Sequence, residues 1–192
     1  MKSQLILSAT LGILLAACQN NATKEASIED VPVKMESSIE RGKYLVEIMD
    51  CTSCHSPKVF TPNGPVPNPS RLFGGYDGSQ PFPELSDSEK EIAKKWVLFY
   101  PDLTAAVGPW GVSFAGNISS SDTGIGTWSL AQFKKALTEG KFKGIENSRT
   151  LLPPMPWQAY KALSDDDIKA IYDYLKSTKP VDNIVPSPML NF

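Results

Sequence analysis

Two cysteines and the one histidine of the chain stand together in the segment Cys51-Thr52-Ser53-Cys54-His55. C-x-x-C-H is the pattern by which c-type haem is attached to protein. The two thiols add to the haem vinyl groups, and the adjacent imidazole binds the iron. Two intervening residues set the thiols one porphyrin edge apart and leave the next residue under the iron. The sequence therefore predicts one covalent haem c, attached at Cys51 and Cys54, with His55 as the proximal iron ligand.

Two other uses of a cysteine pair fit this segment less well. A structural zinc site needs four ligands, usually Cys or His, and apart from Cys18, which belongs to the N-terminal signal discussed below, no fourth ligand is available outside carboxylates. A thioredoxin-type C-x-x-C lies between a strand and a helix of a βαβ unit, whereas the segment before Cys51 has a helical pattern. Haem attachment explains both the spacing and the residue types.

The N-terminal segment 1–17 is typical of a secretory signal, because Lys2 precedes a mostly apolar stretch that is too short to span a membrane. It ends in Leu15-Ala16-Ala17-Cys18, which resembles a bacterial lipobox. By that resemblance Cys18 is lipidated and becomes the first mature residue; an ordinary signal peptide with a free Cys18 is the alternative. We expect residues 18–37 to form a lipid anchor and a flexible tether. The protein would then be exported and held at the periplasmic face of a bacterial membrane.

The sequence pattern of the remaining chain predicts an all-α domain over residues 38–180, followed by an irregular C-terminal tail over residues 181–192. Apolar residues make up 41% of the 192 residues, enough for a core, and 16 prolines predict long irregular loops. Apolar periodicity and caps predict helices over 38–49, 86–100, 127–139 and 164–177. Ser38, Ser86 and Ser164 are the expected N-caps, with Ser129 or Thr127 for the third helix.

The charge balance excludes one class of partner. The full chain has 19 basic and 21 acidic side chains. Removal of the signal segment removes one basic side chain, Lys2, and leaves a net charge of about −3. Such a balance gives no support for nucleic-acid binding. The glycines in the run Asp122–Gly126 lack the strand-to-helix GxGxxG pattern, so we also reject nucleotide binding.

A single histidine makes bis-histidine coordination impossible. Of the five methionines, Met155 is the best distal iron ligand, because Pro153, Pro154 and Pro156 restrict its loop before it binds. Met189, behind a proline, is the next candidate. A carbonyl in the Pro-rich loop after the motif, at Pro67 or Pro69, is expected to accept the hydrogen bond from His55 Nδ1.

The chain resembles class I c-type cytochromes over about residues 39–179. Gly42-Lys43-Tyr44-Leu45 before the motif resembles the N-terminal helix of that family, and Ile171–Leu175 resembles its C-terminal helix. The resemblance implies the class I cytochrome c fold, with about four helices and long loops around one covalent haem. It also implies that Gly42 contacts Tyr174 where the two helices cross, and that Leu175 faces the haem.

A narrower resemblance links the chain to cytochrome subunits of periplasmic dehydrogenases. It rests on Thr123-Gly124-Ile125-Gly126-Thr127-Trp128 and on Met155-Pro156-Trp157 with Tyr160. Those subunits often carry several haems, whereas this chain has one C-x-x-C-H. Side chains of the type that bind haem propionates in the family are Arg71, Trp110, Trp128 and Arg149, but no motif assigns them.

These observations predict a single-electron carrier with His/Met ligation at a membrane surface. Its partners would be a redox donor and an acceptor, such as a dehydrogenase or a quinol-linked complex. The alternatives are a haem enzyme acting on peroxide or another small oxidant, and a haem-based gas or redox sensor. Both alternatives require an open distal site.

Overall fold

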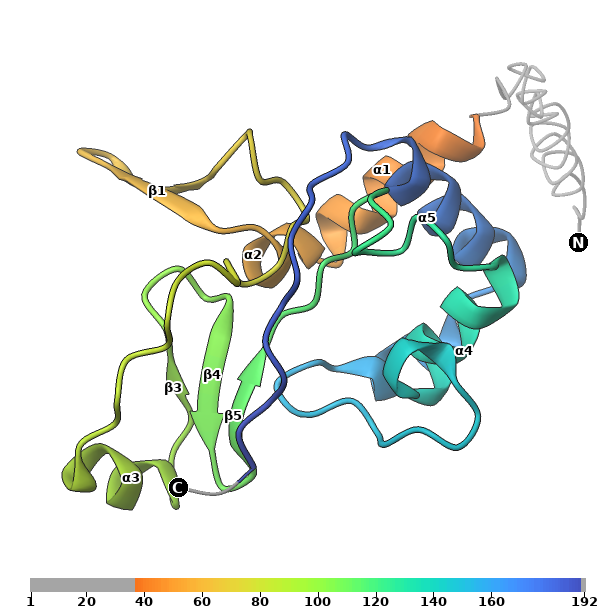
Figure 1. Cartoon of the computed structure of the whole chain (residues 1–192). Helices are drawn as coiled ribbons and strands as arrows, with labels where there is room; N and C mark the ends of the chain where they lie inside the picture. Colours follow the sequence, from red (N-terminus) through yellow and green to blue (C-terminus); the bar gives the residue numbers. More distant parts are fainter. Residues whose placement is uncertain (1–36, 191–192) are drawn as a thin grey trace, which may run out of the picture. The chain divides into compact units, whose positions relative to one another are not determined.

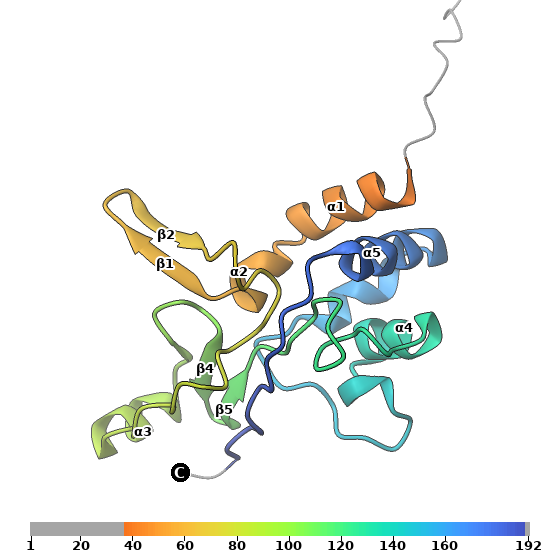
Figure 2. The same ribbon diagram turned by 45° about the horizontal axis from the view of Figure 1, so that its top comes forward.

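The computed structural model describes residues 37–190 (Figure 1). In chain order its elements are α1 (Ser38–Ile48), α2 (Cys51–His55), β1 (Lys58–Thr61), β2 (Gly64–Pro67), α3 (Asp87–Ala93), β3 (Leu98–Phe99), β4 (Ala105–Gly108), β5 (Gly111–Phe114), α4 (Leu130–Glu139), the 3-10 turns η1 (Phe142–Gly144) and η2 (Trp157–Ala162), and α5 (Asp165–Ser177). Helices α1, α4 and α5 lie on one side of α2, and the β3–β5 sheet lies on the other with α3 (Figures 1 and 2). None of the helices in this part of the chain is both long and apolar enough to cross a membrane.

Helices α1 and α5 cross at Gly42, in the manner that the family resemblance implies. Gly42 is buried, and a Cβ atom there would lie 1.9 Å from the carbonyl oxygen of Ala170 and 2.8 Å from Cβ of Tyr174. Only glycine allows the two backbones to approach this closely, which outweighs its cost of about 1 kcal/mol inside a helix. The expected contact between Gly42 and Tyr174 is therefore present.

The helices begin at polar caps, most of which the sequence predicts. Ser86 forms a capping box with Glu89, and Ser129 and Ser164 cap α4 and α5 through their side chains. The expected cap of the first helix was wrong by one residue: Ser37 is the N-cap and forms a complete capping box with Glu40. This frees the Ser38 hydroxyl, which donates to Asp173 Oδ2 on α5 at 2.6 Å.

The all-α prediction was wrong, because two small antiparallel sheets are present. β1 pairs with β2, and β4 pairs with both β3 and β5. The helix predicted over 86–100 ends at Ala93, and Leu98 and Phe99 pair with Val107 and Ala106 instead. The apolar stripe of that predicted helix is not buried, since Trp96 remains 68% exposed. The β4 strand was missed because alanine and glycine have low β-propensity, so its fit to a sheet depends on pairing.

Two apolar clusters hold the described residues together. The larger one joins α1, α4 and α5 with Phe73 and Ile125; its buried members are Leu45, Val46, Phe73, Ile125, Phe133, Leu137, Ile168, Ala170, Ile171 and Leu175. The smaller one joins α3 to the three-stranded sheet through Ala93, Val107 and Val112. The molecule thus has a helical core and a separate core beneath the sheet.

The segment after α5 has no helix or strand over 181–188, yet tertiary contacts hold it in place. The buried Asn183 side chain donates to the carbonyl oxygens of Gly74 and Tyr76 at 2.6 and 2.7 Å. Further on, the backbone of Met189 pairs with Val112 of β5. These contacts fix the segment against the loop that follows the cysteine pair.

Candidate haem-binding site

The cysteine pair and the histidine occupy one short helix, α2, directly after α1. The turn between the helices passes through Asp50, whose φ of 54° is left-handed, and Ser53 donates to the Asp50 carboxylate at 2.7 Å. Both cysteines are free and half-buried. Burial raises the pKa of the Cys51 thiol to about 11 and also raises the pKa of Cys54. Both side chains are therefore neutral thiols at neutral pH.

The orientation of His55 is set by a hydrogen bond to Gly116. Nδ1 of His55 lies 2.7 Å from the Gly116 carbonyl oxygen. Because a carbonyl can only accept, the ring hydrogen must be on Nδ1, which leaves the Nε2 lone pair free for a metal. Burial lowers the pKa of His55, against an opposing effect of the Gly116 bond. The ring is therefore a neutral imidazole with one available nitrogen.

The prediction that a carbonyl of Pro67 or Pro69 accepts the hydrogen bond from His55 Nδ1 was wrong. Pro67 lies in the β1–β2 hairpin, where it pairs with Lys58, while the actual acceptor follows β5, 61 residues after His55. The β3–β5 sheet lies between the two in sequence. The chain returns to His55 after β5. The loop that follows the sheet therefore supplies the acceptor that the Pro-rich loop was expected to supply.

Gly75 links the two backbones that hold the histidine. Its N–H donates to the carbonyl of His55 at 2.8 Å, while Tyr76 donates to Ala115 at 3.0 Å. Gly75 has a φ of 73°, and a Cβ there would lie 2.4 Å from the Ala115 oxygen and 2.6 Å from the carbonyl carbon of Gly116. Only glycine fits between the histidine segment and its acceptor, and no sequence pattern marks this position.

Met155, Tyr160 and Cys51 all pack against the larger apolar cluster. Burial raises the pKa of Tyr160 to about 12. Met155 is half-buried and packs against the larger apolar cluster. Met189 instead is 42% exposed and pairs with β5. Of the two predicted distal ligands, only Met155 packs against the cluster that Cys51 also borders.

The surrounding residues suit a large apolar ring with acidic groups at its edge. Half-buried side chains that pack against the larger cluster include Leu72, Ile118, Trp128, Leu130 and Leu163. Among the described residues, Nε of Arg71 is buried without a hydrogen-bond partner, although its guanidinium also pairs with Asp77 at 2.9 Å. Buried donors are rarely left unpaired. A haem propionate would supply the missing acceptor, so the donor set fits the group.

The other three propionate candidates have partners or packing roles of their own. Trp110 Nε1 donates to Ser113 at 3.2 Å, and Trp128 packs at the edge of the larger cluster. The Arg149 guanidinium lies 4.0 Å from the centre of the Phe142 ring, and burial lowers its pKa. Residues 37–190 hold no group of three or more His, Cys, Asp or Glu side chains that would suit a metal ion.

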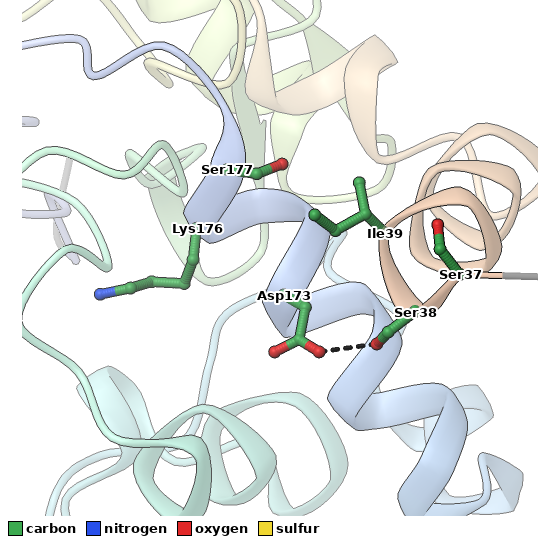
Figure 3. A pocket seen from close by; sticks show the side chains of 6 residues that line it. All are labelled: Ser37, Ser38, Ile39, Asp173, Lys176 and Ser177. Carbon is green, nitrogen blue, oxygen red and sulfur yellow. Dashed lines mark hydrogen bonds between the residues drawn. The ribbon is translucent and has the colours of Figure 1, made fainter.

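A shallow pocket lies elsewhere, between the start of α1 and the end of α5 (Figure 3). Its lining residues are Ser37, Ser38, Ile39, Asp173, Lys176 and Ser177. They include none of the cysteines, the histidine or the methionines, and the bond between Ser38 and Asp173 bridges it. The pocket therefore belongs to the helix crossing and is separate from the candidate site.

Comparison with known proteins defines the family. The sequence matches the cytochrome c family over residues 39–179, and the chain belongs to that family. It is 34% identical over 158 residues to the fructose dehydrogenase cytochrome subunit of Gluconobacter japonicus, covering 81% of this chain and 24% of that protein. It is 30% identical over 161 residues to the gluconate 2-dehydrogenase cytochrome c subunit of Pantoea cypripedii, covering 80% and 27%.

A smaller relative matches part of the chain over almost its own full length. Cytochrome c-551 of Bacillus subtilis is 30% identical over 112 residues, which is 50% of this chain and 96% of that protein. The dehydrogenase subunits are much longer, and this chain spans about a quarter of their length. Family membership establishes covalently bound haem c as the cofactor and the class I cytochrome fold as the architecture.

Proposed function

We propose that this protein is a single-electron carrier whose haem is attached at Cys51 and Cys54, with His55 and Met155 as axial ligands. One observation carries the proposal most directly: the bond from His55 Nδ1 to Gly116 leaves Nε2 as the free ligand nitrogen. A hydrogen bond at the far ring nitrogen also orients a metal-binding histidine and raises its basicity. Met155 also packs against the apolar cluster that Cys51 borders.

The bound haem would take up and release one electron. A Met155 thioether bound to the iron would leave little room for other chemistry, because it would occupy the site that an oxidant or a gas needs. Histidine–methionine ligation also raises the reduction potential relative to two histidines. We therefore expect a carrier that accepts electrons from a dehydrogenase or a quinol-linked donor and passes them to a second redox protein.

The dehydrogenase partner is argued from the relatives. Two of them are named as cytochrome subunits of sugar and sugar-acid dehydrogenases, and the match covers one stretch of each long chain. The single C-x-x-C-H motif here corresponds to one electron-carrying domain. We propose that this domain transfers electrons as a separate carrier, and that a similar domain does so as one part of a larger dehydrogenase subunit.

Spectroscopy of Met155→Ala tests the ligation directly. We expect the wild-type protein to be low-spin, with an iron–thioether charge-transfer band in the oxidised state, and Met155→Ala to lose that band. Met189→Ala is the matched control and should retain it. A wild-type protein that is already high-spin and binds carbon monoxide readily would overturn the proposal and favour the peroxide-enzyme or sensor alternative.

The membrane location is a separate part of the proposal and lies outside the described residues. It rests on the lipobox-like Leu15-Ala16-Ala17-Cys18. Expressed in a bacterium, the wild-type chain should pellet with membranes and resist a salt wash, because two acyl chains give stable anchoring. Cys18→Ser should move the haem protein to the soluble periplasmic fraction. Equal membrane retention of both proteins would contradict lipid anchoring.

A further inference from the structure

The loop that contains Met155 is held from two sides. On one side the Ser113 hydroxyl of β5 donates to the carbonyl oxygen of Pro153 at 2.6 Å. On the other side Trp157 lies over Gly140 at the end of α4, where a Cβ atom would lie 2.4 Å from the indole ring. The methionine therefore sits between one contact to the sheet and one contact to a helix.

The direction of the hydrogen bond from Ser113 is set by Trp110. Nε1 of Trp110 lies 3.2 Å from Ser113 Oγ, and an indole N–H can only donate. The serine oxygen thus accepts from Trp110, and its own hydrogen goes to an acceptor. Pro153 O at 2.6 Å is closer than Ala106 O at 3.4 Å. The three residues form an ordered chain, from Trp110 to Ser113 to Pro153.

Both ends of this chain are rigid. The Trp110 ring packs on Gly108 across the β4–β5 turn, where a Cβ atom would lie 2.5 Å from the ring. Ser113 is only 7% exposed. At the other end, the rings of Pro153 and Pro154 fix φ at two successive residues. Holding the Pro153 carbonyl therefore restricts the position of Met155, two residues further on.

We propose that Ser113 is a positioning residue for Met155, so that the β4–β5 hairpin sets the geometry of the distal ligand. The inference rests on the proposed ligation by Met155. An iron–thioether bond is weak, so the balance between the ligated and the open state depends on contacts that hold the loop. Removing the hydroxyl leaves Pro153 O and Trp110 Nε1 without this partner, so the side-chain hydrogen bond that ties the loop to β5 is lost.

The experiment compares the purified haem protein as wild type, Ser113→Ala, Ser113→Thr and Trp110→Phe. Two readouts are used: the rate of carbon monoxide binding to the reduced iron, and the temperature at which the thioether band is lost relative to helix unfolding. Ser113→Ala should bind carbon monoxide about tenfold faster, which corresponds to about 1.4 kcal/mol, and should lose the band well before the helices unfold. Ser113→Thr should restore both values, and Trp110→Phe should shift them in the same direction by less.

Two further variants separate the possible failures. Thr104→Val removes another buried hydroxyl next to β4, one that donates to Asp102 at 2.6 Å, and should leave carbon monoxide binding unchanged. If Ser113→Ala binds carbon monoxide at the wild-type rate, or if Thr104→Val accelerates binding equally, the positioning role is overturned. Should Ser113→Ala not fold, Trp110→Phe decides the question in the same way. A thioether band that survives in Met155→Ala overturns the ligation itself.

Discussion

The His55 ring makes a hydrogen bond through Nδ1 and leaves Nε2 free to bind a metal, and the bond at Nδ1 determines both features. It fixes the tautomer and it directs the remaining nitrogen. The acceptor is a backbone carbonyl, so no side-chain substitution at Gly116 removes it. The bond can instead be perturbed through Gly75, which touches the backbone at Ala115 and Gly116.

Gly75→Ala should weaken the histidine bond, because the added Cβ would overlap the Ala115 oxygen and the Gly116 carbonyl. The positive φ of Gly75 adds strain, so we expect a loss of about 2 kcal/mol in the free energy of unfolding. A less basic imidazole donates less to the iron, so the reduction potential should rise. Potentiometry and urea unfolding measure the two effects.

Gly116→Ala is the matched control for this prediction. No atom lies within 4 Å of a Cβ built at Gly116, and the substitution keeps the carbonyl that His55 uses. Its potential should equal that of the wild type. If Gly75→Ala also keeps the wild-type potential while losing stability, the Nδ1 bond does not tune the iron.

At the scale of elements, the α1–α5 crossing is fastened at its polar edge as well as at Gly42. Asp173 of α5 accepts from Ser38 of α1 at 2.6 Å and from Lys169 at 2.5 Å. Burial acts to raise the pKa of Asp173, but these hydrogen bonds outweigh it, and the pKa lies below its ordinary value. The carboxylate is therefore stabilised in the folded state.

The stability from Asp173 should depend on pH in a defined direction. A carboxyl with a lowered folded pKa stabilises fully above its unfolded pKa of about 3.9, and this contribution is lost as pH falls through the lower folded value. Asp173→Asn should lower the free energy of unfolding by about 1 kcal/mol at pH ~7. In urea unfolding, the difference from wild type should shrink at pH ~3.

An exposed carboxylate away from the crossing provides the comparison. Asp122 is exposed, and Asp122→Asn should change stability little at either pH. If Asp173→Asn destabilises equally at both values, the link between α1 and α5 does not depend on the charge.

For the molecule as a whole, the two apolar clusters predict an uneven response to loss of the cofactor. The larger cluster is edged by half-buried side chains that a haem would cover, whereas the smaller cluster under the sheet is centred on the fully buried Ala93. A bound haem would contribute apolar surface to the first cluster, and burial of such surface is worth roughly 25 cal/mol per Å².

Cys51→Ala combined with Cys54→Ala should remove the covalent haem. Hydrogen–deuterium exchange should then rise most in α1, α4 and α5, and less in β4 and β5, because the sheet has its own core. The double variant and the wild-type haem protein are compared peptide by peptide. Equal loss of protection in both regions would show that the clusters unfold as one unit.

The local features of this protein were predictable from the sequence. The position of the cysteine pair and histidine after a helix, the caps at Ser86 and Ser164, and the close contact at Gly42 follow from short patterns, whereas the choice of Ser129 over Thr127 as the cap of α4 did not. Each depends on residues that are neighbours in sequence or on a glycine with a known packing role. The roles of Cys18 and Met155 stay predictions.

The tertiary structure alone decided which distant groups complete the site. The acceptor for His55 is a backbone carbonyl, and since every residue has one, no residue type marks Gly116 in advance. The β4–β5 hairpin consists largely of small residues with weak strand preference, so it forms through pairing and through its cover by α3. The bond from Ser113 to Pro153 follows from that arrangement. Sequence patterns report local preference, whereas these contacts depend on where the folded chain returns to itself.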